Sequence, residues 1–206
     1  MTALRPLLAL LALLVASLLG ACSILPKSEV LQVYRLPAQP LASQAPTVDW
    51  ALRVNKPYSS QLLDSTRIAV LPPGDQISAY QGVRWSDRAP LLLRDRLIDA
   101  LRDDGRIPAV SSDDSRLHAD LELSSDLRAF HSEYQGDRPQ ARILLEARLV
   151  QSGSLRILAS RRFNVSQTAS DASVGAVVQA FGLAADQLAK ELVDWTLEQG
   201  LATRQP

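Results

Sequence analysis

The clearest chemical motif of the sequence is Leu19-Gly20-Ala21-Cys22, which ends in a cysteine that could be modified. These residues follow Arg5 and an apolar run from Pro6 to Leu19, which supply the positive n-region, short h-region and small-residue cleavage site of a secretory signal peptide. The four residues match the bacterial lipobox, in which the cysteine takes a diacylglyceryl group, the peptide is cut before it, and its new amine is acylated. We therefore predict a signal peptide over residues 1–21 and lipidation of Cys22.

An alternative is a plain secreted protein whose signal peptide ends near a free thiol. Cys22 is the only cysteine of the chain, so it cannot form an internal disulfide. Two or more acyl chains, palmitate among them, anchor a protein stably to a membrane. Residues 22–29 would then be a lipidated tether. Ser23 stands where an Asp favours retention in the inner membrane, which indicates the outer membrane, with the domain facing the periplasm.

Other side chains that could carry chemistry are scattered. His118 and His131 have no metal-ligand spacing, and the sequence contains no Gly-x-Ser-x-Gly elbow and no phosphate-binding glycine loop. The acidic pairs Asp103-Asp104 and Asp113-Asp114 flank the ends of predicted elements, where solvated turn residues are common. We therefore expect no catalytic residue, no metal site, no cofactor and no enzymatic activity.

Charge and length limit the class of protein further. Of 22 basic residues one lies in the signal peptide, which leaves 21 basic against 22 acidic residues in a mature chain of 185 residues. This balance lacks the basic excess that nucleic-acid binding requires. The mature length fits one domain with a sizeable core, which we place at residues 30–203.

The hydrophobic pattern predicts a sheet and two helices. Alternating apolar and polar residues are typical of half-buried strands, and the Ser152-Gly153-Ser154 turn indicates a hairpin. The predicted strands span residues 30–36, 48–54, 67–71, 77–85, 107–110, 121–129, 143–149 and 155–165. Residues 36–46, rich in Pro, Ala, Gln and Ser, are predicted to be an extended loop.

The first predicted helix has clear boundaries. Asp87 is placed to cap its start, Pro90 to occupy its first turn, and Gly105 to end it. Leu93, Leu97, Ala100 and Leu101 form its apolar stripe, and Arg94, Asp95, Arg102 and Asp103 lie outside the stripe. A second helix is predicted over about residues 171 to 200, although Gly175 and Gly182 each weaken it by roughly 1 kcal/mol relative to Ala.

These elements define an α+β fold. In the last three predicted strands one face is apolar and the other polar, so the apolar face must be covered. We expect an antiparallel-rich mixed sheet with the two main helices packed on one face.

One segment concentrates aromatic and charged residues, Tyr80-Gln-Gly-Val-Arg-Trp-Ser-Asp87. It has two interpretations. In the first, Trp85 packs against Leu92 or Leu93 and the segment is structural. In the second, Tyr80, Arg84 and Trp85 form an aromatic contact surface for a partner or for lipid.

The order of these features resembles the ABC-type transport auxiliary lipoproteins, the family that includes the paraquat-inducible lipoprotein. The matching segments are Cys22-Ser-Ile-Leu-Pro26, Val33-Tyr-Arg-Leu36, Leu63-Asp-Ser-Thr-Arg-Ile-Ala-Val70, Tyr80…Arg84-Trp85-Ser-Asp87 and the final helix with Asp194-Trp195. Gln81 departs from the family pattern, in which a second aromatic residue often follows Tyr80.

The resemblance implies a non-enzymatic docking subunit of an intermembrane lipid transport system. Its partners would be a periplasmic MCE-domain protein and, through it, an inner-membrane permease and ATPase. A homo-oligomer is compatible with such a role. The alternative is an outer-membrane assembly or cell-wall-binding lipoprotein unrelated to transport.

Overall fold

The computed structural model describes residues 30–42, 47–74 and 76–202. The chain divides into two compact units, Met1–Val30 and Leu31–Pro206. Cys22 and the rest of the predicted signal peptide and tether lie outside the described residues. The second unit contains every core residue that the structure describes.

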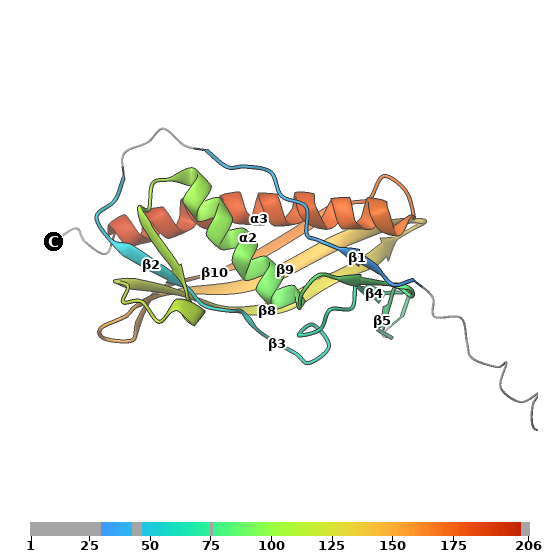
Figure 1. The fold of residues 1–206 in the computed structure, drawn as a ribbon, viewed down its shortest axis with the longest axis horizontal. Coiled ribbons are helices and arrows are strands. Elements are labelled where there is room, and N and C mark those ends of the chain that lie inside the picture. Colours follow the sequence, from blue (N-terminus) through green and yellow to red (C-terminus); the bar gives the residue numbers. More distant parts are fainter. Residues whose placement is uncertain (1–29, 43–46, 75, 203–206) are drawn as a thin grey trace, which may run out of the picture. The chain divides into compact units, whose positions relative to one another are not determined.

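Three long antiparallel strands form the main part of an eight-stranded sheet. β8 (Leu121–Gln135) pairs with β9 (Arg138–Gln151), and β9 pairs with β10 (Arg156–Thr168) (Figure 1). Gly136, with a φ of 62°, makes the tight β8–β9 turn in the left-handed conformation that glycine adopts without steric cost. β8 and β10 extend beyond the predicted segments, and the predicted hairpin between β9 and β10 is confirmed.

The second edge of β8 is shared by three short parallel strands in succession. β2 (Ala51–Val54), β3 (Tyr58–Ser59) and β4 (Ala69–Leu71) pair with it from its beginning toward its end. β7 (Ala109–Ser112) continues the sheet beside β2, and β5 (Ser78–Ala79) beside β4. The short apolar segment at β4 therefore lies between two strands, as its sequence predicts for a central strand.

The predicted strand over residues 77–85 is wrong as a single element. The chain instead forms β5, a turn at Gly82 with a φ of 69°, and β6 (Val83–Trp85). β6 pairs in parallel with β1 (Gln32–Tyr34) in a separate two-stranded sheet. Gly82 causes the break, because its left-handed conformation cannot continue a strand.

β-Bulges change which side chains face the core. One lies between Leu127 and Ala129 in β8, and another between Ile157 and Ala159 in β10. A bulge adds one residue to a strand, so the alternation of inward and outward side chains shifts across it. Ile157, predicted to face the core, is accordingly 55% exposed, whereas Phe163 and Val165 are buried as predicted. Leu155, also predicted to face the core, lies in the turn before β10 and is 75% exposed.

The first helix, α2 (Ala89–Asp104), has the predicted apolar stripe and C-terminus. Leu93, Leu97 and Leu101 are at most 1% exposed, and Gly105 ends the helix with a φ of 75°. The prediction of Asp87 as N-cap is wrong. Arg88 occupies that position, and the Asp87 carboxylate accepts a hydrogen bond from the backbone N–H of this adjacent residue at 2.7 Å, outside the helix.

The second helix, α3 (Val174–Ala202), packs against β9, β10 and α2. Figure 1 shows it extending along the sheet while α2 crosses the same region obliquely. Apolar side chains of both helices and of the sheet form one core cluster. The α+β class, with a mixed and mostly antiparallel sheet, is therefore confirmed. The short 3-10 helix η2 (Asp113–Ser115) follows β7.

The segment between β1 and β2 passes close against α3. A Cβ atom placed on Gly182 would lie 2.8 Å from Pro37 Cβ and 2.9 Å from the Pro37 carbonyl oxygen. A Cβ on Gly200 would lie 2.5 Å from the Trp50 ring. At both positions the absence of a side chain allows the chain to approach the helix, which outweighs the low helix propensity of glycine.

A buried ion pair fastens the same segment to both helices. Arg96 of α2, 5% exposed, lies 2.7 Å from the Asp186 carboxylate of α3, and its guanidinium donates to the Gln39 carbonyl oxygen at 2.8 Å. The Asp186 carboxylate also accepts the Gln39 backbone N–H at 3.1 Å. One arginine and one aspartate thus satisfy both backbone groups of Gln39.

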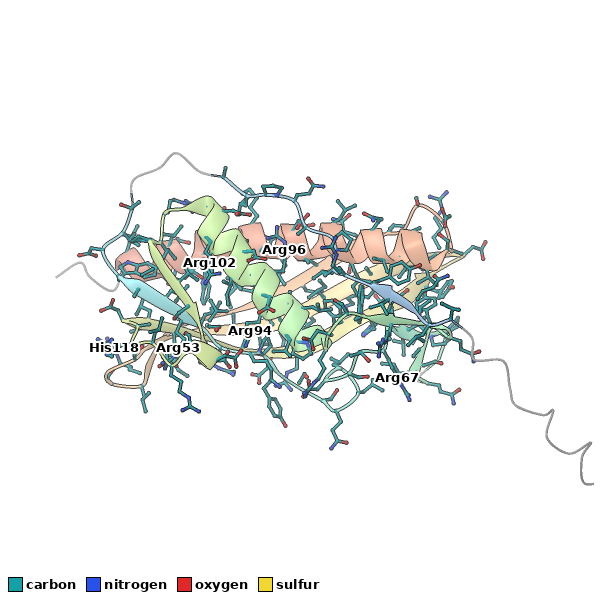
Figure 2. All side chains as sticks on the ribbon, in the orientation of Figure 1. Arg53, Arg67, Arg94, Arg96, Arg102 and His118 are labelled. Carbon is teal, nitrogen blue, oxygen red and sulfur yellow. The ribbon has the colours of Figure 1, made fainter. Side chains whose placement is uncertain are left out.

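Arg94 corrects the sequence interpretation, which placed it outside the buried surface of α2. It is 7% exposed and forms ion pairs with Asp113 at 2.9 Å and with Asp114 at 2.6 Å. These hydrogen bonds outweigh the cost of burial and raise the pKa of the Arg94 guanidinium. Figure 2 shows Arg94 and Arg96 on α2.

Gly182→Ala should destabilise the protein by about 1–3 kcal/mol, because the new methyl group overlaps Pro37. Gly175→Ala is the matched control, since a Cβ there meets no atom within 4 Å. It should instead stabilise the protein by up to ~1 kcal/mol through helix propensity. Chemical denaturation of both variants measures the difference, and stabilisation by Gly182→Ala would contradict the close approach.

Arg96→Ala should lower the free energy of unfolding by about 3 kcal/mol, because it leaves the Asp186 carboxylate without its cation and the Gln39 carbonyl without its donor. Lys190→Ala is the control, because its ion pair with Asp194 is solvent-exposed on both sides and should contribute less than about 1 kcal/mol. Equal effects of the two substitutions in urea titrations would refute the structural role of Arg96.

Candidate functional site

The three residues of the predicted contact surface do not share one environment. Trp85 is 0% exposed, and its ring makes edge-on contacts with Phe130, at a centroid distance of 5.9 Å, and with Phe181, at 5.3 Å. Trp85 is therefore a core residue and is removed from the contact surface. The burial of Trp85 agrees with the first interpretation of the Tyr80–Asp87 segment, in which this tryptophan has a structural role.

Strand alternation separates Trp85 from its neighbour Arg84. In the β1–β6 pair, Tyr34 is in register with Trp85 and Val33 with Arg84. Because successive side chains of a strand point to opposite faces, Trp85 enters the core while Val33 and Arg84 lie on the exposed face. Val33 is 51% exposed, and Arg84 is also exposed.

Tyr80 lies between β5 and β6 and is half-buried. Its hydroxyl is 3.1 Å from the Ser132 hydroxyl of β8, which is fully buried. Burial raises the pKa of the Tyr80 phenol, and the hydrogen bond with Ser132 opposes this effect only in part. Tyr80 is thus a neutral hydroxyl that connects the β5–β6 segment to the main sheet.

Tyr80 and Arg84 line one surface pocket of about 480 Å³. Segments distant in sequence contribute to it, from the residue before β1, the residues before β4, and the β5–β6 segment. The lining consists of Leu31, Thr66, Arg67, Ser78, Ala79, Tyr80, Gln81, Val83 and Arg84. Figure 2 labels Arg67 at this end of the molecule and His118 at the other.

The pocket offers hydrogen-bond donors and positive charge. Thr66 and Ser78 present hydroxyl groups, Arg67 and Arg84 present guanidinium groups, and none of the nine lining residues is acidic. Arg67 and Leu31 also line the pocket, although the sequence pattern did not identify them as site residues. No local signal marks them as site residues, because only the pairing of β1 with β6 and of β4 with β5 brings them beside Tyr80 and Arg84.

His131 lies near this site but inside β8, in register with Ala69 of β4. Its Nε2 atom is 3.4 Å from the Glu133 carboxylate, which also pairs with Arg142 at 3.4 Å. Burial lowers the pKa of His131 below its ordinary value of 6.5, and Glu133 opposes this shift. The imidazole has no nucleophile beside it in these contacts, so its arrangement is that of a structural residue.

Two observations limit the chemistry of the described residues. Residues 30–42, 47–74 and 76–202 contain no group of three or more His, Cys, Asp or Glu side chains arranged to hold a metal ion. Among the helices of this part of the chain, none combines the length and apolar character needed to cross a membrane.

The fold and the pocket define an α+β domain that presents a polar, cationic surface site. The sequence pattern of the ABC-type transport auxiliary lipoprotein component matches residues 34–193, and the chain belongs to this family. The family resemblance drawn from the sequence is thereby confirmed.

Similar proteins agree with this assignment. The crystal structure of XCC0632 from Xanthomonas campestris is 36% identical, with a TM-score of 0.80 over 85% of this chain and 99% of that chain. Another crystal structure, of an uncharacterized protein, has a TM-score of 0.64 at 17% identity over 81% of this chain and 98% of its own, a likeness of fold.

A curated relative is also uncharacterized. The protein bll6063 of Bradyrhizobium diazoefficiens is 31% identical over 161 residues, which cover 77% of this chain and 42% of that protein. The chain therefore spans about two fifths of the length of this relative.

The buried position of His131 predicts a pH dependence. Because its pKa is lowered in the folded state, the unfolded chain binds the proton more readily, and stability should fall as the pH decreases below about 6.5. His131→Gln should flatten the melting-temperature profile between pH 6.5 and about 5. His118→Gln, at an exposed position, is the control, and a profile altered by His118 rather than His131 would contradict this assignment.

Proposed function

We propose that the protein is a non-enzymatic docking subunit of an MCE-linked intermembrane lipid transport system, anchored to the periplasmic face of the outer membrane through acylated Cys22. The observation that carries this proposal is the family match over residues 34–193, which follows a lipobox pattern at residues 19–22. A lipid anchor followed by one α+β domain is suited to holding partners at a membrane rather than to performing a reaction.

The proposed partners are a periplasmic MCE-domain protein and, through it, the inner-membrane permease and ATPase. Self-association of the docking subunit is compatible with this arrangement. Ser23 supports delivery to the outer membrane, and the near-neutral charge of the mature chain disfavours nucleic acid as a partner. These elements of the proposal rest on the family and on the sequence.

The surface by which this subunit contacts a partner or lipid is proposed to involve Tyr80 and Arg84, without Trp85. Both line the same 480 Å³ pocket, and Arg84 is exposed. The domain begins at Leu31, which lines the same pocket, so the contact residues lie where the tethered segment joins the domain.

The tether and the docking function should be separable. A Cys22→Ser variant should not be labelled by radioactive palmitate, because it lacks the single cysteine thiol that would receive the diacylglyceryl group. A form exported to the periplasm without Cys22 should still fold and co-purify with the MCE-domain protein. It should nevertheless fail to restore the membrane barrier of a deletion strain, because docking no longer occurs at the outer membrane.

The wild-type acylated chain, expressed at the same level, is the positive control for both measurements. Full restoration of the barrier by the untethered form would show that the anchor is irrelevant to the activity. Purification of the acylated protein from native membranes without any MCE-domain component would refute the proposed partner.

A further inference from the structure

Arg67 and Arg84 belong to the arginines of the described domain whose charges are not used internally, and the exposed Arg156 is another. Arg88, Arg94 and Arg96 in the same part of the fold all form ion pairs. The guanidinium groups of Arg67 and Arg84 form no ion pair or side-chain hydrogen bond with any described residue, yet both line one pocket. Two unpaired cations converging on a concavity favour an anionic ligand.

The remaining polar groups of the pocket also suit an anion. Thr66 and Ser78 supply hydroxyl donors, and the side-chain amide of Gln81 supplies a further donor. Among the described residues, no acidic side chain lines the pocket and competes for the arginines. Arginine is the side chain best matched to phosphate, because its planar group donates two parallel hydrogen bonds. The volume of about 480 Å³ is large enough for a phosphorylated headgroup.

Exposed apolar side chains adjoin this cationic site. Val33 of β1 is in register with Arg84 of β6 and is 51% exposed, and Leu31 lines the pocket and is 46% exposed. Apolar groups beside arginines match the boundary between phosphate headgroups and acyl chains, where arginine contacts phosphate and aliphatic side chains enter the apolar region. A free soluble phosphate would use only the cationic half of this surface.

The position of the surface along the chain favours a membrane lipid. Leu31 begins the domain, and Cys22 lies nine residues before it. Fully extended, that segment spans at most about 30 Å, so an acylated Cys22 would keep the pocket within this distance of the bilayer surface.

We propose that the pocket between Arg67 and Arg84 binds the phosphate group of a phospholipid headgroup, with Leu31 and Val33 contacting the adjoining apolar part of the lipid. The inference rests on the proposed function only in taking acylated Cys22 as the membrane attachment. It assigns the contact of Arg84 to a phospholipid.

The test uses a chain that begins at Ser23, which keeps every described core residue and has no acyl group to bind membranes by itself. Its co-sedimentation is measured with vesicles of phosphatidylethanolamine and phosphatidylglycerol. Vesicles of digalactosyldiacylglycerol, a neutral lipid without phosphate, are the comparison. We expect binding to the phospholipid vesicles that exceeds binding to the glycolipid vesicles by on the order of tenfold.

Charge-removing variants locate the site. The double substitution Arg67→Gln and Arg84→Gln should reduce phospholipid binding by about tenfold or more, because each arginine near an anionic surface contributes several-fold. Arg156→Gln, an exposed arginine at the start of β10, removes the same charge elsewhere and should leave binding nearly unchanged. Val33→Ser should weaken vesicle binding without the loss of any charge.

Calorimetry with glycerol phosphate distinguishes a lipid from a soluble ligand. Weak binding of glycerol phosphate, lost in the double variant, would support a headgroup site that requires the bilayer. Glycerol phosphate affinity equal to that for vesicles, together with an unaffected Val33→Ser variant, would overturn the lipid assignment. Equal binding to both vesicle types, or a double variant that binds like the wild type with an unchanged melting temperature, would overturn the phosphate site.

Failure of this inference differs from failure of the proposed function. If the vesicle experiments are negative while acylated protein still captures the MCE-domain partner, the docking role stands and the pocket has another use. If partner capture fails while phospholipid binding depends on Arg67 and Arg84, the phosphate site stands and the docking role does not.

Discussion

The buried ion pair between Arg96 and Asp186 is the interaction on which the arrangement of the domain depends. It joins α2 to α3, and through both backbone groups of Gln39 it fixes the segment that follows β1. A buried pair is stable only when its remaining hydrogen-bonding capacity is satisfied, and the peptide groups of Gln39 satisfy it here. The same segment crosses α3 where Gly182 leaves room for Pro37. The Arg96–Asp186 ion pair and the absence of a side chain at Gly182 therefore fix the position of the segment that follows β1.

That placement determines the surface at the N-terminal end of the domain. Once the segment is fixed, β1 can pair with β6, which directs Trp85 into the core against Phe130 and Phe181 and leaves Arg84 outside. The hydrogen bond between Tyr80 and Ser132 attaches the adjoining turn to β8. The pocket is thus formed by rigid elements, although it is open to solvent. Binding of a ligand would therefore require ordering of the exposed Arg67 and Arg84 side chains rather than of the backbone elements.

Charged side chains on the polar face of the sheet pair with one another across neighbouring strands. Glu146 of β9 lies between Arg128 and Arg162 on the neighbouring strands, and these cations lower the pKa of its carboxyl group. Charge pairs of this kind across strands satisfy an exposed sheet face and contribute modestly to its stability. Arg67 and Arg84 differ from these arginines because they have no side-chain partner in the described domain and line one pocket together, which favours an external anion. The family of transport auxiliary lipoproteins, to which the chain belongs, provides the context of a membrane component.

Local patterns in the sequence were sufficient for the fold class, the stripe of α2 with its Gly105 terminus, the β9–β10 hairpin and the family, because periodicity and turn chemistry act over a few residues. The lipobox at Cys22 is likewise a local signal, and its acylation stays a prediction. Tertiary structure alone decided the burial of Arg94 and Trp85 and the exposure of Ile157 beside a bulge. It also brought Leu31 and Arg67 to Arg84. These outcomes depend on strand pairing and on ion pairs between residues that are distant in the sequence. A pattern that extends over a few neighbouring residues cannot predict such contacts.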